Sequence, residues 1–167
     1  MNNRLTYLMA AVGALAVVVV VTALLVPDNV PAYEAAVAFA NAAGKGDAST
    51  AMSLLSEELQ AWVRANCPGG SVSACVDDYT PPDWGGMLST VFRRAQPVPG
   101  ADGFDVQLVA TYEDNQGFSG VCIYTQVMRQ PDGAWLITRW SGWFSCDDPN
   151  SGLSALISSP NVPNRAP

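Results

Sequence analysis

The sequence predicts an α+β domain that follows an N-terminal transmembrane helix, and three observations support this fold class. Leu5–Val26 is an uncharged, largely apolar run of 22 residues. From Ala32 to Asn66 the apolar residues recur with helical spacing, and from Val91 onward the period changes to two, as in antiparallel strands. We therefore expect two to three helices packed on a curved four-stranded antiparallel sheet.

The N-terminal run is long enough to cross a bilayer, because roughly 20 apolar residues in a helix span the hydrocarbon core. Arg4 precedes the run and Asp28 follows it, so the positive-inside rule places the N-terminus in the cytoplasm. The chain from Pro27 onward would then lie outside, as the periplasmic or extracellular part of a single-pass protein of the cell membrane. A signal peptide cleaved near residues 30–32 is the alternative, although its apolar region is usually shorter.

Composition divides the chain into four segments. They are an anchor at 1–26, a short linker at 27–31, a folded domain at 32–146 and an extended tail at 147–167 that is rich in Ser, Asn and Pro.

The helical part of the domain contains three predicted helices. The first runs from Ala32 to a C-terminal cap at Gly44, and the second from an N-cap at Asp47 to about Asn66. A third, shorter helix is expected over about 82–90.

The sheet is predicted from alternation and from the turn sequences PGADG, DNQG and QPDG. The expected strands are 91–98, 104–113, 118–129 and 134–145. We expect Glu113 to lie opposite Phe118, and Gln130 opposite Gly133.

This register separates two sheet faces. The first face is almost entirely apolar and should meet the helices: Val106, Leu108, Ala110, Tyr112, Val121, Ile123, Val127, Leu136, Trp140 and Phe144. The opposite face carries more aromatic and aliphatic surface than a solvated sheet normally shows. We interpret it as a protein interface formed by Tyr124, Met128, Trp135, Ile137, Arg139 and Trp143. The alternative is that the tail folds back and covers it with Leu153, Leu156 and Ile157.

The chain has four cysteines and no histidine. Neither the spacing of a zinc site nor a C-x-x-C redox motif is present, and cysteines outside the cytoplasm normally pair. We favour a Cys67–Cys75 disulfide around the turn residues Pro68–Gly70, which leaves Cys122 to pair with Cys146. In the predicted register the second pair lies on opposite faces, so it requires a bulge near Ser141-Gly142 or a turn after Phe144.

The charge balance argues against nucleic acid as a partner. The net charge is −7, with only eight Lys and Arg residues, whereas phosphate binding needs clustered positive charge. No cofactor is predicted.

Two segments resemble the nuclear transport factor two-like superfamily. The helical segment AAVAFANAAGKGDASTAMSLLSEEL matches its A-x-x-F-x-x-A, G-D and A-x-x-L-L-S elements, and the hairpin VMRQPDGAWLITRW resembles its closing strands. The resemblance covers about 32–145 and implies two helices followed by a curved antiparallel sheet. It does not specify a function, because the superfamily contains enzymes, binding modules and assembly subunits. Bacterial members on one membrane helix often look like non-catalytic partners in envelope complexes.

Enzymes of that superfamily usually place His, Asp and Tyr in a pocket between sheet and helices, and this chain has no His. Tyr112 is expected on the core face without a carboxylate beside it. We interpret three adjacent acidic pairs as solvent-exposed surface or loop residues: Glu57-Glu58, Asp77-Asp78 and Asp147-Asp148. A calcium site at Asp77, Asp78 and Asp83 is disfavoured because no D-x-D-x-D-G loop is present.

The sequence therefore favours a non-catalytic accessory or assembly subunit of a larger membrane complex, with electron transport as one setting. Its partners would be the membrane, through the N-terminal helix, and other protein subunits. The alternative is a binding module for a small apolar ligand or lipid, lined by Trp62, Trp84 and Trp140, although these tryptophans could equally fill the core.

Overall fold

The computed structural model describes residues 30–114, 120–146 and 165–166. The predicted anchor at Leu5–Val26 lies outside these ranges, as does most of the predicted tail. None of the helices within them is long and apolar enough to cross a membrane.

The predicted α+β class is confirmed. The described part of the chain contains the α-helices α2 (Val30–Gly44), α3 (Ala48–Ser53), α4 (Glu57–Asn66) and α5 (Val72–Tyr79). Short 3-10 turns occupy Pro68–Gly70 and Pro82–Trp84. The strands are β1 (Met87–Pro97), β2 (Gly103–Tyr112), β3 (Val121–Arg129), β4 (Trp135–Ser145) and the two-residue β5 (Arg165–Ala166).

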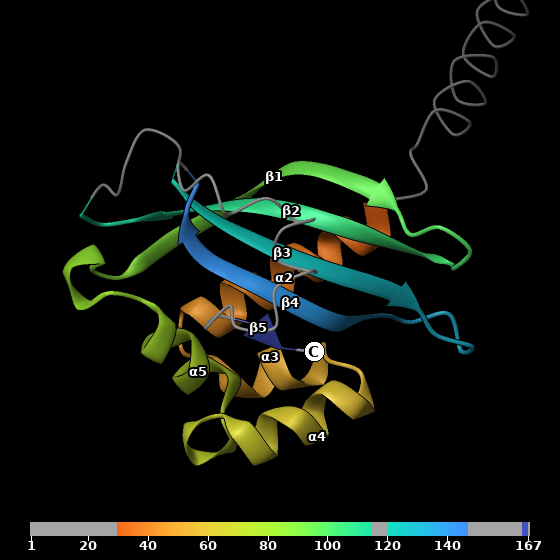
Figure 1. Ribbon diagram of the computed structural model, residues 1–167, viewed down its shortest axis with the longest axis horizontal. Helices are drawn as coiled ribbons and strands as arrows, with labels where there is room; N and C mark the ends of the chain where they lie inside the picture. The colour runs from red at the N-terminus through yellow and green to blue at the C-terminus, as the bar shows by residue number, and fades with distance from the viewer. Residues whose placement is uncertain (1–29, 115–119, 147–164, 167) are drawn as a thin grey trace, which may run out of the picture. The chain divides into compact units, whose positions relative to one another are not determined.

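The four long strands form one antiparallel sheet in chain order, and β5 joins its far edge beside β4. Figure 1 shows the strands as a curved layer, with α2 running behind them and α3, α4 and α5 grouped below β4. The edge of β1 is the opposite boundary, and β1 pairs with a described strand on one side only.

The predicted second helix is interrupted. Asp47 caps α3 as expected, by accepting a hydrogen bond from the Thr50 N–H at 3.1 Å. The helix ends at Ser53, however, with Leu54 as its C-cap, and α4 begins after a second N-cap at Ser56. The reason is a backbone link to β4: the Ser56 N–H donates to the Ile137 carbonyl, and the Ile137 N–H donates to the Leu54 carbonyl, both at 2.9 Å.

The third predicted helix is wrong, and an unpredicted one replaces it. Residues 82–84 form only a 3-10 turn, and β1 begins at Met87. The extra helix is α5, which starts inside the CPGGSVSAC segment and is capped by the Ser71 side chain. The Cys67–Cys75 disulfide therefore joins the end of α4 to the first turns of α5, rather than closing an irregular loop.

The predicted β2–β3 register is confirmed by pairs such as Leu108 with Ile123 and Ala110 with Val121. The predicted β3–β4 register is wrong by one residue, because Gln130 pairs with Ala134 and not with Gly133. Gly133 adopts φ +90° and forms the last residue of a three-residue loop. A type I turn followed by a left-handed glycine has this geometry, and the extra residue reverses the faces of the strand that follows.

Two bulges then change the faces of β4 again. The first lies between the pairs Val127–Ile137 and Gln126–Arg139, and the second between Ile123–Gly142 and Cys122–Phe144. Trp143 is the extra residue in the second bulge and has φ 58°, a rare backbone conformation for a bulky side chain. This bulge confirms the irregularity that the Cys122–Cys146 pairing requires.

The core lies between the helices and the inner face of the sheet. Trp140 is its centre: its ring lies 5.6 Å from that of Phe39 on α2 and 5.8 Å from that of Trp62 on α4. Trp143 contacts Phe39 edge-on at 6.5 Å. The side chains of α2, α4 and β4 therefore meet at one aromatic cluster, which buries the largest residues of the domain.

We predict that Ser56→Ala lowers the free energy of unfolding by about 1 kcal/mol, because the Leu59 N–H at the start of α4 loses its side-chain acceptor. Urea unfolding followed by circular dichroism measures the change. Ser53→Ala is the matched control, since Ser53 is exposed and caps no helix; it should change stability by less than about 0.5 kcal/mol. Equal losses in the two variants would contradict the role of Ser56 as a cap.

Candidate functional site

The outer face of the sheet, which points away from the helices, carries a polar row across four strands. Four residues form this row, each lying opposite the next on the neighbouring strand: Arg94 on β1, Gln107 on β2, Tyr124 on β3 and Ser141 on β4. Gln107 and Tyr124 are only 5% and 4% exposed. Arg94 is exposed, but Gln107, Tyr124 and Ser141 are buried. Buried polar side chains are unusual on this face, because the outer face of an antiparallel sheet is normally solvated.

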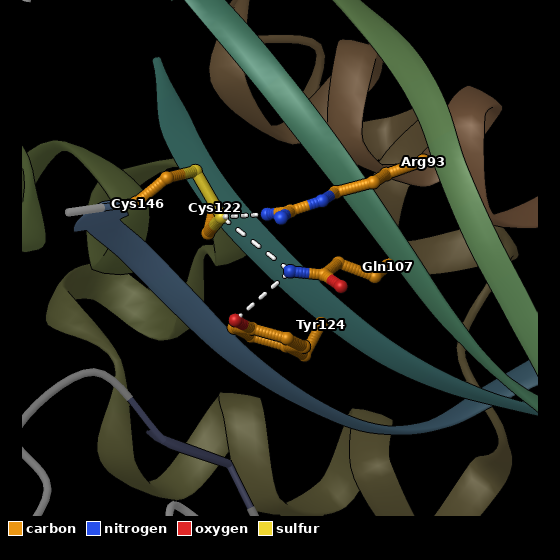
Figure 2. Close-up of a disulfide and its surroundings, with 5 residues drawn as sticks. All are labelled: Arg93, Gln107, Cys122, Tyr124 and Cys146. Atoms are coloured by element: carbon orange, nitrogen blue, oxygen red, sulfur yellow. Dashed lines mark hydrogen bonds between the residues drawn. A yellow bond between two sulfur atoms is a disulfide. The ribbon is translucent and has the colours of Figure 1, made fainter. Parts of the chain in front are cut away.

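A hydrogen-bonded cluster connects this row to the second disulfide. The Gln107 Nε2 donates to the Tyr124 hydroxyl at 3.0 Å and to the Cys122 Sγ at 3.5 Å. The Arg93 Nη1 reaches the same sulfur at 3.7 Å. Figure 2 shows the Arg93 and Gln107 side chains reaching toward Cys122, with the Tyr124 hydroxyl beside the Gln107 amide. Within the described structure the Gln107 Oε1 has no hydrogen-bond partner. The amide group is therefore oriented by the two hydrogen bonds that its Nε2 donates.

A bulge in β1 places Arg93 at this cluster. The β1–β2 register shifts between Phe92 and Arg94, so Arg93 is an extra residue opposite β2. Consecutive residues of a regular strand point to opposite faces, whereas a bulge can direct both toward one face. The bulge therefore explains how two consecutive residues, Arg93 and Arg94, both lie on the outer face.

The outer face is locally basic in an acidic chain. Arg93, Arg94 and Arg139 lie there, and in the part of the chain that the structure describes none of them forms an ion pair. Asp105 is the acidic residue of this face, and it accepts a hydrogen bond from the Gln126 Nε2 at 3.2 Å. Sequence analysis missed the arginine pair, although two adjacent cations in a chain with eight in total were a visible signal.

An exposed apolar edge adjoins this face. Leu88, Val91 and Phe92 on β1 are 52%, 53% and 39% exposed. Phe92 also packs edge-on against Tyr33 of α2, with ring centroids 4.8 Å apart. These side chains were missed because β1 was expected to begin only at Val91, which left Leu88 in a helix.

The interface predicted from the sequence is not assembled. Tyr124, Met128 and Arg139 belong to the outer face, as expected. Ile137 and Trp143 are buried in the core. Trp135 lies on the helix side, partly buried against Phe104. The extra residue in the β3–β4 loop moves Trp135 and Ile137 to the helix side of the sheet. It also moves Leu136, which was predicted for the core, to the outer side. The second bulge turns Trp143 inward. The alternative, in which the tail covers the outer face, falls on residues outside the described ranges.

Both predicted disulfides are present, Cys67–Cys75 and Cys122–Cys146. They differ in their surroundings, because the described side-chain donors gather only at Cys122.

A second surface feature is an acidic groove beside β4. It is lined by residues of the α4 N-terminus, the β3–β4 turn and β4, namely Ser56, Glu57, Glu58, Gln130, Pro131, Asp132, Leu136 and Thr138. It is open, and no cluster of three His, Cys, Asp or Glu residues suited to a metal occurs among the described residues. Asp77, Asp78 and Asp83 are exposed and form no such cluster.

Tyr112 occupies the core position predicted for it. It is buried and its ring contacts Trp84 edge-on at 5.3 Å. Burial raises the pKa of Tyr112, and the nearby charge of Asp77 adds to this, while the neighbouring polar groups of Thr80 and Trp143 oppose it. The phenol therefore stays neutral at physiological pH. Trp84 and Trp140 are likewise buried and Trp62 partly so, all in ring contacts, which favours core filling over a ligand lining.

No family model matches the chain, and no curated protein or solved structure is significantly similar to it. The resemblance to the nuclear transport factor two-like superfamily stays a prediction.

We predict that Trp143→Ala lowers the free energy of unfolding by about 3–5 kcal/mol, because it removes a large side chain from the aromatic cluster. Arg139→Ala, on the outer face of the same strand, should change stability by about 0.5 kcal/mol or less. Guanidinium unfolding followed by circular dichroism compares the two. A Trp143→Ala variant as stable as Arg139→Ala would contradict the inward position of Trp143.

Proposed function

We propose that the chain is a non-catalytic membrane protein whose extracytoplasmic domain binds another subunit of a membrane complex. The observation that carries this proposal is the apolar edge of β1, formed by Leu88, Val91 and Phe92. Large apolar side chains this exposed, gathered within one short stretch of a boundary strand, mark contact sites more often than solvated surface.

The location of this edge supports a protein partner. β1 is the boundary strand of the sheet, and its free side is not paired with any described strand. Arg93 and Arg94 follow the apolar residues directly. Interface centres combine aromatic and aliphatic side chains with Arg and are depleted in Lys. The only Lys of the chain, Lys45, follows α2, so the strands carry none.

The proposed compartment rests on the disulfides and on the N-terminal run. Two disulfides that use all four cysteines are typical of an oxidising compartment. With an anchor ending at Val26, only Pro27, Asp28 and Asn29 separate it from α2. Three residues span at most about 11 Å, so the domain would stay close to the bilayer, where it meets other membrane subunits.

A membrane-complex subunit is favoured over a ligand-binding module because the sheet–helix interior is occupied by ring contacts. Phe39, Trp62 and Trp140 fill the space in which an apolar ligand would sit.

The test is co-purification of the full chain from its own membranes in mild detergent. We expect a stoichiometric partner with the wild-type chain, and its loss when Leu88→Glu and Val91→Glu are combined. Because both side chains are more than half exposed, the melting temperature should change by less than about 3 °C. A photo-crosslinking residue at position 92 should join the chain to the same partner.

Ala61→Glu combined with Ala65→Glu is the matched control. Both alanines are exposed on α4, so the pair adds the same charge to a helix surface away from β1. The control should keep the partner. Retention of the partner by the Leu88 and Val91 double variant, or purification of the wild-type chain alone, would reject the proposal.

A further inference from the structure

The two disulfides have different chemical surroundings. In Cys67–Cys75 both cysteines are buried, and the structure describes no side-chain donor at either sulfur. In Cys122–Cys146 the Cys122 sulfur receives the Arg93 guanidinium at 3.7 Å and the Gln107 amide at 3.5 Å. The chain therefore holds one disulfide with a cation and an amide donor at a single sulfur, and one without them.

Such donors suit a thiolate better than a disulfide. A disulfide sulfur is a weak, neutral acceptor, whereas a thiolate is an anion that Arg and N–H donors stabilise. Because Cys122 is buried, its thiolate would depend on these two side chains for the solvation that water does not supply. The cluster is thus matched to the reduced state of Cys122.

The two sulfurs also differ in access. Cys122 lies within β3 and is fully buried, while Cys146 follows the end of β4 and is partly exposed. An incoming thiolate therefore reaches Cys146 first, and Cys122 becomes the leaving group. Thiol–disulfide exchange is faster when the leaving thiol has a low pKa, and the contact with Arg93 favours that condition.

We propose that Cys122–Cys146 is a thiol–disulfide exchange site that reacts with a dithiol protein of the oxidising compartment. The partner's thiolate attacks the Cys146 Sγ and forms a mixed disulfide, while the Cys122 Sγ takes the electron pair and leaves as a thiolate beside Arg93 and Gln107. The partner's second thiol, after losing its proton, attacks the mixed disulfide and releases Cys146 as a thiolate, which takes up a proton. The partner leaves oxidised by two electrons, and the reverse sequence restores the disulfide.

Reduction would act on the end of β4. The disulfide holds Cys146 beside β3, next to the bond in which the Cys146 N–H donates to the Gly120 carbonyl at 3.0 Å. Without the covalent link, the end of β4 is held by this hydrogen bond and by its pairing with β3, where Ser145 lies opposite Val121. The redox state would therefore change how firmly the last residues of β4 are attached. Cys67–Cys75 keeps α4 and α5 joined throughout.

The test uses the full chain, with dithiothreitol as the dithiol. The protein is equilibrated at graded ratios of reduced to oxidised dithiothreitol, quenched with acid and labelled with a maleimide, and peptide mass spectrometry reads each cysteine pair. We expect Cys122–Cys146 to be half-reduced at a ratio about tenfold or more below that for Cys67–Cys75, which serves as the internal reference.

Variants of the adjacent arginines test the cause. Arg93→Gln should raise the ratio needed to reduce Cys122–Cys146 by about fivefold to tenfold, and Arg93→Lys should restore part of the difference because it keeps the charge. Arg94→Gln is the matched control, since no described bond joins Arg94 to the sulfur; it should behave as the wild type.

Two results would overturn the proposal. One is simultaneous reduction of both disulfides in the wild-type chain. The other is an equal effect of Arg93→Gln and Arg94→Gln. If Arg93→Gln merely loosened the fold, the Cys67–Cys75 pair would become easier to reduce as well, and that outcome also counts against a specific role for Arg93.

Discussion

The register of β4 against β3 is the constraint on which the rest of the domain depends. It is set at the β3–β4 turn, where Gly133 adopts φ +90° and adds a third residue to the loop. That residue directs Ile137 into the core, where its backbone also bonds the segment between α3 and α4. Two bulges then keep Trp140 inward and turn Trp143 inward as well, against Phe39 of α2. A side chain in place of hydrogen at residue 142 would meet the Cys122 carbonyl at 2.7 Å, so Gly142 is required where the second bulge forms.

The sequence predicted what depends on composition and simple periodicity. The α+β class, the C-terminal end of α2, the N-cap at Asp47, the β2–β3 register and both disulfides were recognised from local patterns. The errors share a different cause, because each depends on an interaction between distant segments or on one backbone angle. The break at Leu54–Ser56 is caused by backbone hydrogen bonds with Ile137, about eighty residues further along the chain. The QPDG turn fits two-residue and three-residue loops equally well, and a slip of one residue moves Trp135 and Ile137 to the other face. The predicted interface failed for that reason, and only Tyr124, Met128 and Arg139 stayed outside.

Bulges in β1 shape the candidate site in the same way. The β1–β2 register shifts at Leu88 and again at Arg93. The first shift leaves an exposed leucine on the edge strand, and the second brings a guanidinium to the Cys122 sulfur. Each bulge gives up regular ladder hydrogen bonding, and bulges recur where a strand has to re-aim a side chain. The two features proposed to be functional thus arise from irregularities that alternation alone does not reveal.

The same bulges limit how a partner can bind the β1 edge. A partner strand that paired along β1 would need a regular row of backbone groups, and only Ser89–Phe92 lies between the two shifts. Beyond Arg93 the strand ends within a few residues at Pro97, which has no N–H to donate. Bulges, charges and Pro are the devices that protect edge strands from open-ended pairing. Four residues of ladder provide few backbone hydrogen bonds, so recognition would have to come from side-chain packing on Leu88, Val91 and Phe92. The edge is therefore suited to a folded apolar surface rather than to an added strand.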